Sequence, residues 1–272
     1  MTVQGLFTPS GNESIQDLTP AQAIPEFRLT DQALSQDEEW FEIKIDGKWQ
    51  RRRLHDYNEL YNIPGLYEAL FNKTLRTSSP LRVVNLLVDV MSDTEHSPEG
   101  LRVLDLGAGS GMVGHELQNH NVEICVGADI IPEAKDATMR DRPWCYDDYF
   151  VADFTDLDKD VSEKVRGYNL NALTCVAALG FGDIPAKAFL TAIELLETPA
   201  YVAFNIKEDF VQERDTSGFA ELIRELARRD VLHMQAYRRY QHRISCAGEP
   251  LYYIAMIATK EREVPLDLLQ SV

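Results

Sequence analysis

Short apolar runs separated by stretches of helical length make up the second half of the chain. Five of these runs are nearly continuous in apolar residues, which is typical of parallel strands that are covered on both faces. The runs lie at residues 101–106, 123–129, 149–154, 170–176 and 199–206. Between them, stretches such as 111–120 and 184–196 have helical spacing. The alternation predicts an α/β fold with a Rossmann-like sheet flanked by helices.

The C-terminal part departs from this alternation. An amphipathic helix is predicted from Phe219 to Arg229, and two strand-like segments follow it at 231–245 and 251–260. The turn Gly248-Glu249-Pro250 separates these two segments. We therefore expect an antiparallel C-terminal hairpin that closes one edge of a seven-stranded sheet.

The N-terminal part has a different character. Residues 1–39 hold seven acidic residues and one basic residue, and we expect this arm to be extended or partly disordered. Alternating apolar residues then precede Asp46-Gly47, a favoured hairpin turn. Helical spacing in 56–91 predicts two or three helices. We expect residues 1–99 to form an arm, a hairpin and a helical cap, and residues 100–272 to form the α/β domain.

Charge and composition exclude several classes of function. The chain has 27 Lys and Arg residues against 44 Asp and Glu residues, a net charge of −17, so it repels phosphate-rich partners. We expect no nucleic-acid partner and no membrane partner, since no apolar run approaches the roughly 20 residues that cross a bilayer. The N-terminus lacks the features of a signal peptide, and we expect a cytoplasmic protein. Four cysteines without Cys-x-x-Cys spacing predict no metal site.

A glycine-rich turn follows the first of the five apolar runs. The segment Gly107-Ala108-Gly109-Ser110-Gly111 lies between this strand and a helix predicted to open near Gly111. Glycines allow positive φ and the close approach of a ligand. Gly109-x-Gly111-x-x-Gly114 also has dinucleotide-binding spacing, which leaves a nicotinamide-dependent reductase open. Asp105 argues against that reading, because a carboxylate repels a diphosphate but suits a cationic amino or sulfonium group.

Further carboxylates follow at intervals of one strand-helix-strand unit. Asp129 lies 24 residues after Asp105, and Asp153 lies 24 residues after Asp129. Because ligands of open α/β sheets bind beyond the carboxyl ends of the strands, we expect Asp129 to hold the hydroxyls of a ribose. We expect Asp153 and Phe154 to contact an adenine ring. Each aspartate alone is also a common helix N-cap, but three of them beside a glycine turn indicate a ligand site.

At these residues the chain resembles the class I S-adenosylmethionine-dependent methyltransferases, over roughly residues 100–260. VLDLGAGSG resembles the first motif of that family, GADI the second and VADF the third. The resemblance implies S-adenosylmethionine as the cofactor, with the loop along its methionine part, Asp129 on the ribose and Asp153 at the adenine end. The residues expected to bind the cofactor are Tyr57, Asp105, Gly107, Ala108, Gly109, Gly111, Asp129, Ile130, Asp153, Phe154 and Ala177.

The sequence departs from the family pattern at two places, and the first argues against one class of methyl acceptor. The tip of the expected fourth strand, Cys175 to Leu179, lacks the N/D-P-P-Y signature of relatives that methylate adenine or glutamine nitrogens. Tyr168-Asn169 stands where many members have Phe-Asp. More loosely, the chain resembles small methyltransferase-like proteins of unassigned substrate.

Catalytic residues are harder to assign from the sequence. Tyr57 and Tyr61 resemble the Y-x-x-x-Y pattern with which small-molecule members close a helix over the cofactor, although a core pair has the same spacing. Methyl transfer mainly needs alignment and exclusion of water, so a general base is optional. The candidates are Tyr61, Asn205 and His242, with Tyr237 as a further one, and each is also compatible with a structural role.

Methyl transfer to a small organic molecule is therefore the first hypothesis from the sequence. Aromatic residues in the N-terminal part, such as Trp40, Trp49 and Tyr67, favour an apolar or aromatic acceptor. The expected acceptor site lies between the N-terminal helices, the turn Leu179-Gly180-Phe181 and Asn205. The alternatives are a non-catalytic scaffold or binding protein that retains the fold, a protein methyltransferase and a nicotinamide-dependent reductase. The sequence defines neither the acceptor atom nor the oligomeric state.

Overall fold

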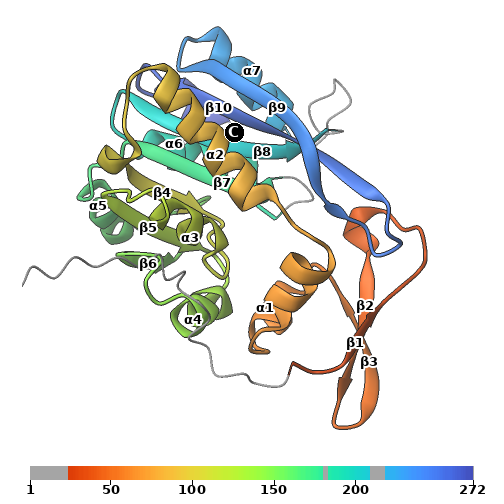
Figure 1. Cartoon of the computed structure of the whole chain (residues 1–272). Coiled ribbons are helices and arrows are strands. Elements are labelled where there is room, and N and C mark those ends of the chain that lie inside the picture. The colour runs from red at the N-terminus through yellow and green to blue at the C-terminus, as the bar shows by residue number, and fades with distance from the viewer. Residues whose placement is uncertain (1–23, 180–182, 209–217, 272) are drawn as a thin grey trace, which may run out of the picture.

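A mixed β-sheet lies at the centre of the molecule (Figure 1). The computed structural model describes residues 24–179, 183–208 and 218–271. The strands of this sheet are β4 (Arg102–Leu106), β5 (Ile124–Asp129), β6 (Asp148–Val151), β7 (Ala172–Leu179), β8 (Ala200–Lys207), β9 (Leu232–Ile244) and β10 (Pro250–Lys260). Their order is β6-β5-β4-β7-β8-β10-β9, and β10 runs antiparallel to both β8 and β9. This order confirms the predicted seven-stranded sheet with its C-terminal hairpin.

Helices cover both faces of the sheet, because its strands are apolar on both sides. The helices are α2 (Ser79–Asp93), α3 (Met112–Gln118), α4 (Pro132–Asp141), α5 (Lys159–Arg166), α6 (Ala186–Glu194), α7 (Phe219–Arg228) and α8 (Leu266–Ser271). Apolar residues of α2 and α3 pack into one core, and those of α5, α6, α7 and α8 pack into the core on the opposite face. Within the described ranges, no helix combines the length and the apolar surface needed to cross a bilayer.

A second, smaller sheet lies in the N-terminal part (Figure 1). Its antiparallel strands are β1 (Phe27–Leu29), β2 (Trp40–Ile45) and β3 (Lys48–Arg53). The helical segments of this part are α1 (Tyr57–Tyr61), a π-helical turn (Glu68–Thr74) and the 3-10 turns Gln36–Glu38 and Pro98–Gly100. The predicted hairpin is confirmed, and β1 adds a third strand within the expected extended arm. Residues 1–23 of that arm lie outside the described residues.

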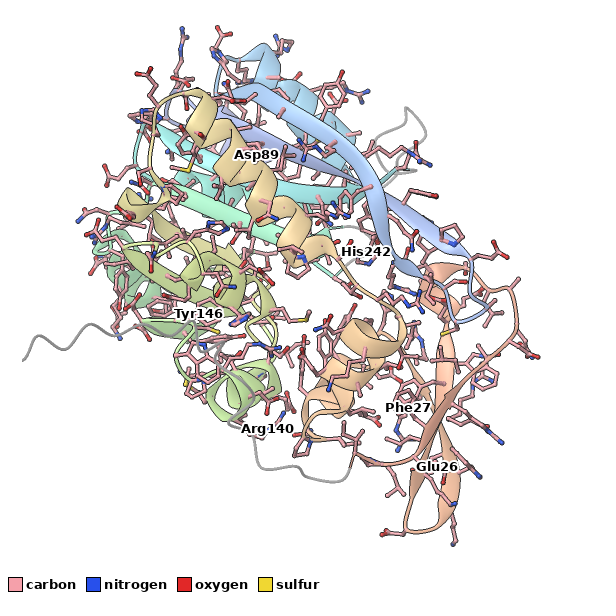
Figure 2. The ribbon with its side chains drawn as sticks, in the orientation of Figure 1. Glu26, Phe27, Asp89, Arg140, Tyr146 and His242 are labelled. Atoms are coloured by element: carbon pink, nitrogen blue, oxygen red, sulfur yellow. The ribbon has the colours of Figure 1, made fainter. Side chains whose placement is uncertain are left out.

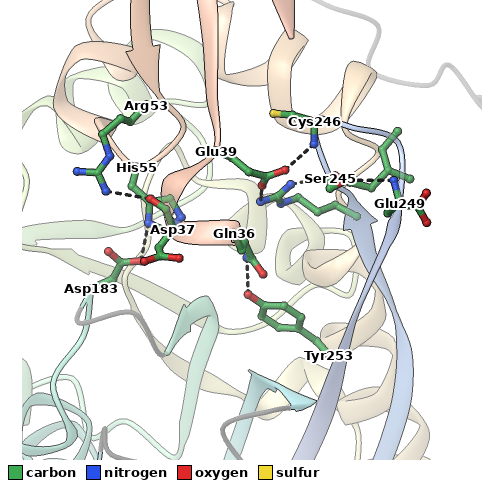
Figure 3. A network of polar contacts seen from close by, with 12 residues as sticks. Gln36, Asp37, Glu39, Arg53, His55, Asp183, Ser245, Cys246, Glu249 and Tyr253 are labelled. Atoms are coloured by element: carbon green, nitrogen blue, oxygen red, sulfur yellow. Dashed lines mark hydrogen bonds and ion pairs between the residues drawn. The ribbon is translucent and has the colours of Figure 1, made fainter. Parts of the chain in front are cut away.

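The two sheets are joined by a buried ion pair at the end of the β9–β10 hairpin (Figure 3). The side chains of Glu39 and Arg243 are each 2% exposed, and Arg243 Nη2 donates to Glu39 Oε2. The other carboxylate oxygen accepts from the Cys246 amide, and Arg243 Nη1 donates to the Ile244 carbonyl. Both charges therefore have several partners, which a buried ion pair requires.

The expected division at residues 99 and 100 stays a prediction. α2 precedes that position in the chain, yet it packs against β7, β8, β9 and β10 of the central sheet. Its apolar face, which includes Val83, Val84 and Leu87, is buried in the core on that side. The N-terminal residues thus contribute one covering helix to the central sheet as well as the smaller sheet.

We predict that Glu39→Ala lowers the free energy of unfolding by about 3 to 5 kcal/mol, because it leaves the buried Arg243 charge without its partner. Urea denaturation of both proteins measures the change. Glu42→Ala is the control, since Glu42 forms an ion pair with the exposed Arg28 and its removal should cost at most about 1 kcal/mol. Equal losses in the two variants would contradict the role given to the buried pair.

Candidate functional site

A cleft opens at the edge of the central sheet where β4, β5, β6 and β7 end. The empty space within it is about 1090 Å³ when the solvent at its open mouth is included. The loop after β4 forms one wall, and the N-terminal segment with α1 forms another. The lining residues include Tyr57, Tyr61, Tyr67, Thr77, Gly107, Ala108, Gly109, Asp129, Ile130, Asp153, Phe154, Val176, Ala177, Asp183 and Ile184.

The glycine-rich loop holds its shape through its own amides. Gly107 N and Ala108 N donate to the Ala128 carbonyl at 2.8 and 3.1 Å. Gly109 N donates to Asp129 Oδ2 at 2.9 Å, and Gly111 N donates to the Ala108 carbonyl at 3.0 Å. A loop that binds a diphosphate must offer such amides to the phosphate oxygens. These four amides are already bonded within the protein, which disfavours a nicotinamide dinucleotide here.

Two glycines of the loop are required by close contacts. Gly107 and Gly109 both have positive φ, at +75° and +53°. A Cβ at Gly109 would lie 2.6 Å from the Tyr61 hydroxyl, and a Cβ at Gly107 would lie 2.8 Å from Ala178 Cβ. The loop therefore presents bare backbone to the cleft. Gly111 does not line the cleft; it is the N-cap of α3, and a Cβ there would face Thr138, Cys145 and Tyr146.

Asp129 is one of the carboxylates that line the cleft, together with Asp153 and Asp183. It is the last residue of β5, and its two oxygens accept from Gly109 N and from Ile131 N. Burial raises the pKa of Asp129, while the backbone hydrogen bonds oppose this shift. Each carboxylate oxygen can accept more than one hydrogen bond, so both can also receive hydroxyl donors from a ligand.

Asp105 does not line the cleft, which corrects the expectation that it contacts the cofactor. Its side chain is 1% exposed and accepts from Tyr146 Oη at 2.6 Å and from Thr174 Oγ1 at 2.7 Å. In the strand register Asp105 lies opposite Gly127, two residues before Asp129. The carboxylate is therefore buried beneath the loop. Burial raises the pKa of Asp105 to about 7, although the hydrogen bonds from Tyr146 and Thr174 lower it in part.

Asp153 and Phe154 lie at the rim of the cleft, beyond the end of β6. The strand ends at Val151, earlier than the predicted run to residue 154. Asp153 is exposed, and its Oδ1 accepts from Thr155 N and Thr155 Oγ1, which lowers the pKa of the carboxyl group. Phe154 is only 3% exposed, so it contributes to the core as well as to the cleft. Ile130 lines the cleft with a side chain that is largely exposed.

Three tyrosines form an aromatic wall of the cleft, and the Tyr61 hydroxyl lies close to Gly109 of the glycine loop. The rings of Tyr57 and Tyr61 on α1 are stacked, with their centroids 6.2 Å apart. The centroid of the Tyr67 ring lies 4.9 Å from that of Tyr61. α1 is held against α4, where Arg140 Nη1 donates to the Tyr61 carbonyl (Figure 2). Burial raises the pKa of Tyr61 well above its usual value. The hydroxyl thus stays protonated at neutral pH and can donate a hydrogen bond, but it is a poor general base.

The other candidate catalytic residues lie outside this cleft. Asn205 is fully buried, and its Oδ1 accepts from the Ala177 amide at 2.6 Å. This bond supports Ala177, which has φ of +57° and lines the cleft. His242 is 4% exposed and lines a neighbouring cavity, while Tyr237 on β9 is 76% exposed. Asn205 and Tyr237 line neither cavity, and Asn205 contacts the cleft wall through Ala177.

Several lining residues were not identified from the sequence. Thr77 and Asp183 come from separate segments that carry no recognisable motif, whereas Tyr67 was expected near the acceptor. Gly180 and Phe181, expected beside the acceptor, lie outside the described residues. All four cysteines are buried, and within the described part of the chain no group of three or more His, Cys, Asp or Glu side chains could hold a metal ion.

We predict that Asp105 gives the folded protein a pH-dependent stability. Its folded-state pKa of about 7 is above the unfolded value of 3.8, so its favourable contribution is present below pH 4 and is lost as the pH rises to 7. Relative to Asp105→Asn, the wild type should lose about 1 kcal/mol per pH unit between pH 5 and 7. Urea denaturation across this range measures the difference. A difference that does not change with pH would show that Asp105 titrates normally.

Comparisons with known proteins identify the fold. No protein-family model matches the sequence, and no curated protein matches it either. N-methyltransferase NodS from Bradyrhizobium japonicum, solved with S-adenosyl-L-homocysteine, has 14% identity and a TM-score of 0.53, over 76% of this chain and 97% of that one. An S-adenosylmethionine-dependent methyltransferase from Clostridium acetobutylicum has 10% identity and a TM-score of 0.51, over 76% and 99%. The chain thus has the fold of the class I S-adenosylmethionine-dependent methyltransferases.

Proposed function

We propose that this protein is an S-adenosylmethionine-dependent methyltransferase that acts on a small organic molecule. The observation that carries the proposal is the Asp129 carboxylate, which lines the cleft beside a glycine loop in which four amides are bonded internally. This edge of the sheet therefore offers hydrogen-bond acceptors and negative charge. Such a site favours a ribose and a cationic donor over a diphosphate.

The residues of the cleft fit S-adenosylmethionine. Asp129 would accept from the ribose hydroxyls, and Asp153 with Phe154 would lie at the adenine end. The methionine part would lie along the loop backbone, where Tyr61 and Ala178 approach Gly109 and Gly107 closely. The likeness to NodS, which was solved with S-adenosyl-L-homocysteine, supports the same assignment at the level of the fold.

The chain itself would contribute positioning and exclusion of water. When bound, S-adenosylmethionine would supply a methyl group that moves to a nucleophile while the sulfur keeps the bonding electron pair, leaving S-adenosylhomocysteine and a proton. Tyr57, Tyr61 and Tyr67 shield the cleft on the side of α1 with apolar ring surface. Asn205 fixes the backbone of Ala177 at the tip of β7. Holding the methyl donor and the acceptor in line in such a site would supply much of the rate increase over the reaction in solution.

We predict that Asp129→Asn weakens the binding of S-adenosylhomocysteine by about 1 to 3 kcal/mol, because charge-assisted hydrogen bonds to the ribose become neutral ones. The asparagine keeps an oxygen that can accept from the loop. Isothermal titration calorimetry measures both affinities, and Asp156→Asn, an exposed change outside the cleft, is the control. Unchanged affinity in Asp129→Asn would reject the ribose assignment.

Turnover is tested with methyl-labelled S-adenosylmethionine and a metabolite extract. Label in a small-molecule fraction is the result that the proposal predicts. Label confined to protein would replace it with a protein methyltransferase. Binding of S-adenosylhomocysteine without transfer of label to any fraction would replace it with a non-catalytic binding protein.

A further inference from the structure

The C-terminal end of α4 contacts the glycine-rich loop through two side chains. Thr138 is fully buried, and its Oγ1 donates to the Gly109 carbonyl at 2.8 Å. Arg142, the C-cap of α4, donates from Nη1 to the Ser110 carbonyl at 3.1 Å. Gly109 and Ser110 both line the cleft. The end of α4 therefore holds two consecutive carbonyl groups of the loop.

Arg142 also contacts the N-terminal part of the chain. Its Nη2 donates to Glu68 Oε2 at 2.5 Å, and Glu68 Oε1 accepts from Asn72 Nδ2 at 2.9 Å. Glu68 directly follows Tyr67 of the aromatic wall and is the first residue of the π-helical turn. One guanidinium thus joins the glycine-rich loop to the segment that carries Tyr67. π-helical turns are rare in proteins and often occur at functional sites.

The ion pair between Arg142 and Glu68 is largely shielded from solvent. The two side chains are 13% and 29% exposed. Burial raises the pKa of Glu68, but the Arg142 charge and the hydrogen bonds from Arg142 and Asn72 outweigh it, so the pKa lies below its usual value. Glu68 is therefore ionised at neutral pH, and the guanidinium is always charged. Charge-assisted hydrogen bonds of this kind are stronger than neutral ones.

The two elements that Arg142 joins come close to each other in the cleft. A Cβ at Gly109 would lie 2.6 Å from the Tyr61 hydroxyl, so the loop and the aromatic wall nearly touch there. Arg140, two residues before Arg142, donates to the Tyr61 carbonyl at 3.0 Å. Arg142 itself does not line the cleft. It can therefore affect a bound ligand only by setting the position of the loop relative to the aromatic wall.

We propose that Arg142 is a positioning residue for the cofactor. It holds the glycine-rich loop and the aromatic wall at a fixed separation, so that S-adenosylmethionine enters a preformed space between them. Preorganisation of this kind lowers the cost of ordering the protein when the ligand binds. The inference rests on the proposed function, because that function supplies the ligand.

Arg142→Lys keeps the positive charge, but a single ammonium does not reproduce the two separate bonds of the planar guanidinium. The variant should bind S-adenosylhomocysteine about fivefold more weakly, or weaker still, in isothermal titration calorimetry. Arg102→Lys is the matched control. Arg102 also joins a carboxylate to a carbonyl, those of Glu123 and Tyr168, but it lies at the start of β4, away from the cleft. The control should bind S-adenosylhomocysteine within about twofold of the wild type.

Glu68→Gln is a milder change that tests the connection itself. It removes the negative charge that Arg142 bonds, and S-adenosylhomocysteine should bind about two- to fivefold more weakly. In the Arg142→Lys background the same change should have no further effect, because the connection is already broken. In the free protein, nuclear magnetic resonance should show that Glu68→Gln shifts the amide resonance of Gly111, whose peptide group includes the Ser110 carbonyl. Arg102→Lys should leave that resonance in place.

The outcomes separate this inference from the proposed function. If S-adenosylhomocysteine binds equally to Arg142→Lys and Arg102→Lys, or if the effects of the changes at Arg142 and Glu68 add, the positioning role is wrong and the proposed function stands. An unshifted Gly111 resonance in Glu68→Gln would also reject the connection. If S-adenosylhomocysteine does not bind to the wild type, the proposed function fails, and the positioning of that cofactor fails with it.

Urea denaturation checks that each variant is folded. If Arg142→Lys is not, Glu68→Gln decides the question. Weaker binding of S-adenosylhomocysteine by Glu68→Gln, together with a shifted Gly111 resonance, supports the positioning role. Binding as tight as that of the wild type overturns it.

Discussion

The hydrogen bond from the Gly109 amide to the Asp129 carboxylate ties the glycine-rich loop to the neighbouring strand. Because parallel strands end at one edge of a sheet, this bond links the backbone of the loop to the carboxylate in the wall of the cleft. It also uses an amide that a diphosphate would need. Together with the bonds of Gly107, Ala108 and Gly111, it leaves four loop amides bonded within the protein and the Asp129 carboxylate in the wall of the cleft.

Much of the fold follows from local patterns in the sequence. Continuous apolar runs predict β4, β5, β7 and β8, because strands covered on both faces need apolar residues at every position. The Asp46-Gly47 turn predicts the hairpin of β2 and β3. β1 is only three residues long and lies in an acidic segment, so no periodicity could indicate it. It forms because it pairs with β2.

The sequence predicts that a carboxylate reaches the cleft only where it also locates the very end of a strand. Asp129 ends β5 and reaches the cleft, whereas Asp105, two register positions earlier, is buried against Tyr146 and Thr174. A spacing of 24 residues cannot distinguish these cases, since it fixes the strand but not the position along it. Contacts between segments that are distant in the sequence cannot be predicted from local patterns. The hydrogen bond between Gln36 and Tyr253, for example, joins residues that are 217 positions apart. Both residues line the cavity beside the cleft.

A crystal structure of the full chain with S-adenosylhomocysteine tests the central claim most directly. The account predicts that both ribose hydroxyls lie within hydrogen-bond distance of the Asp129 carboxylate, with the amino acid part of the ligand along Gly107 and Gly109. A ligand whose ribose is turned away from Asp129, or a cleft without ligand at a saturating concentration, would contradict it.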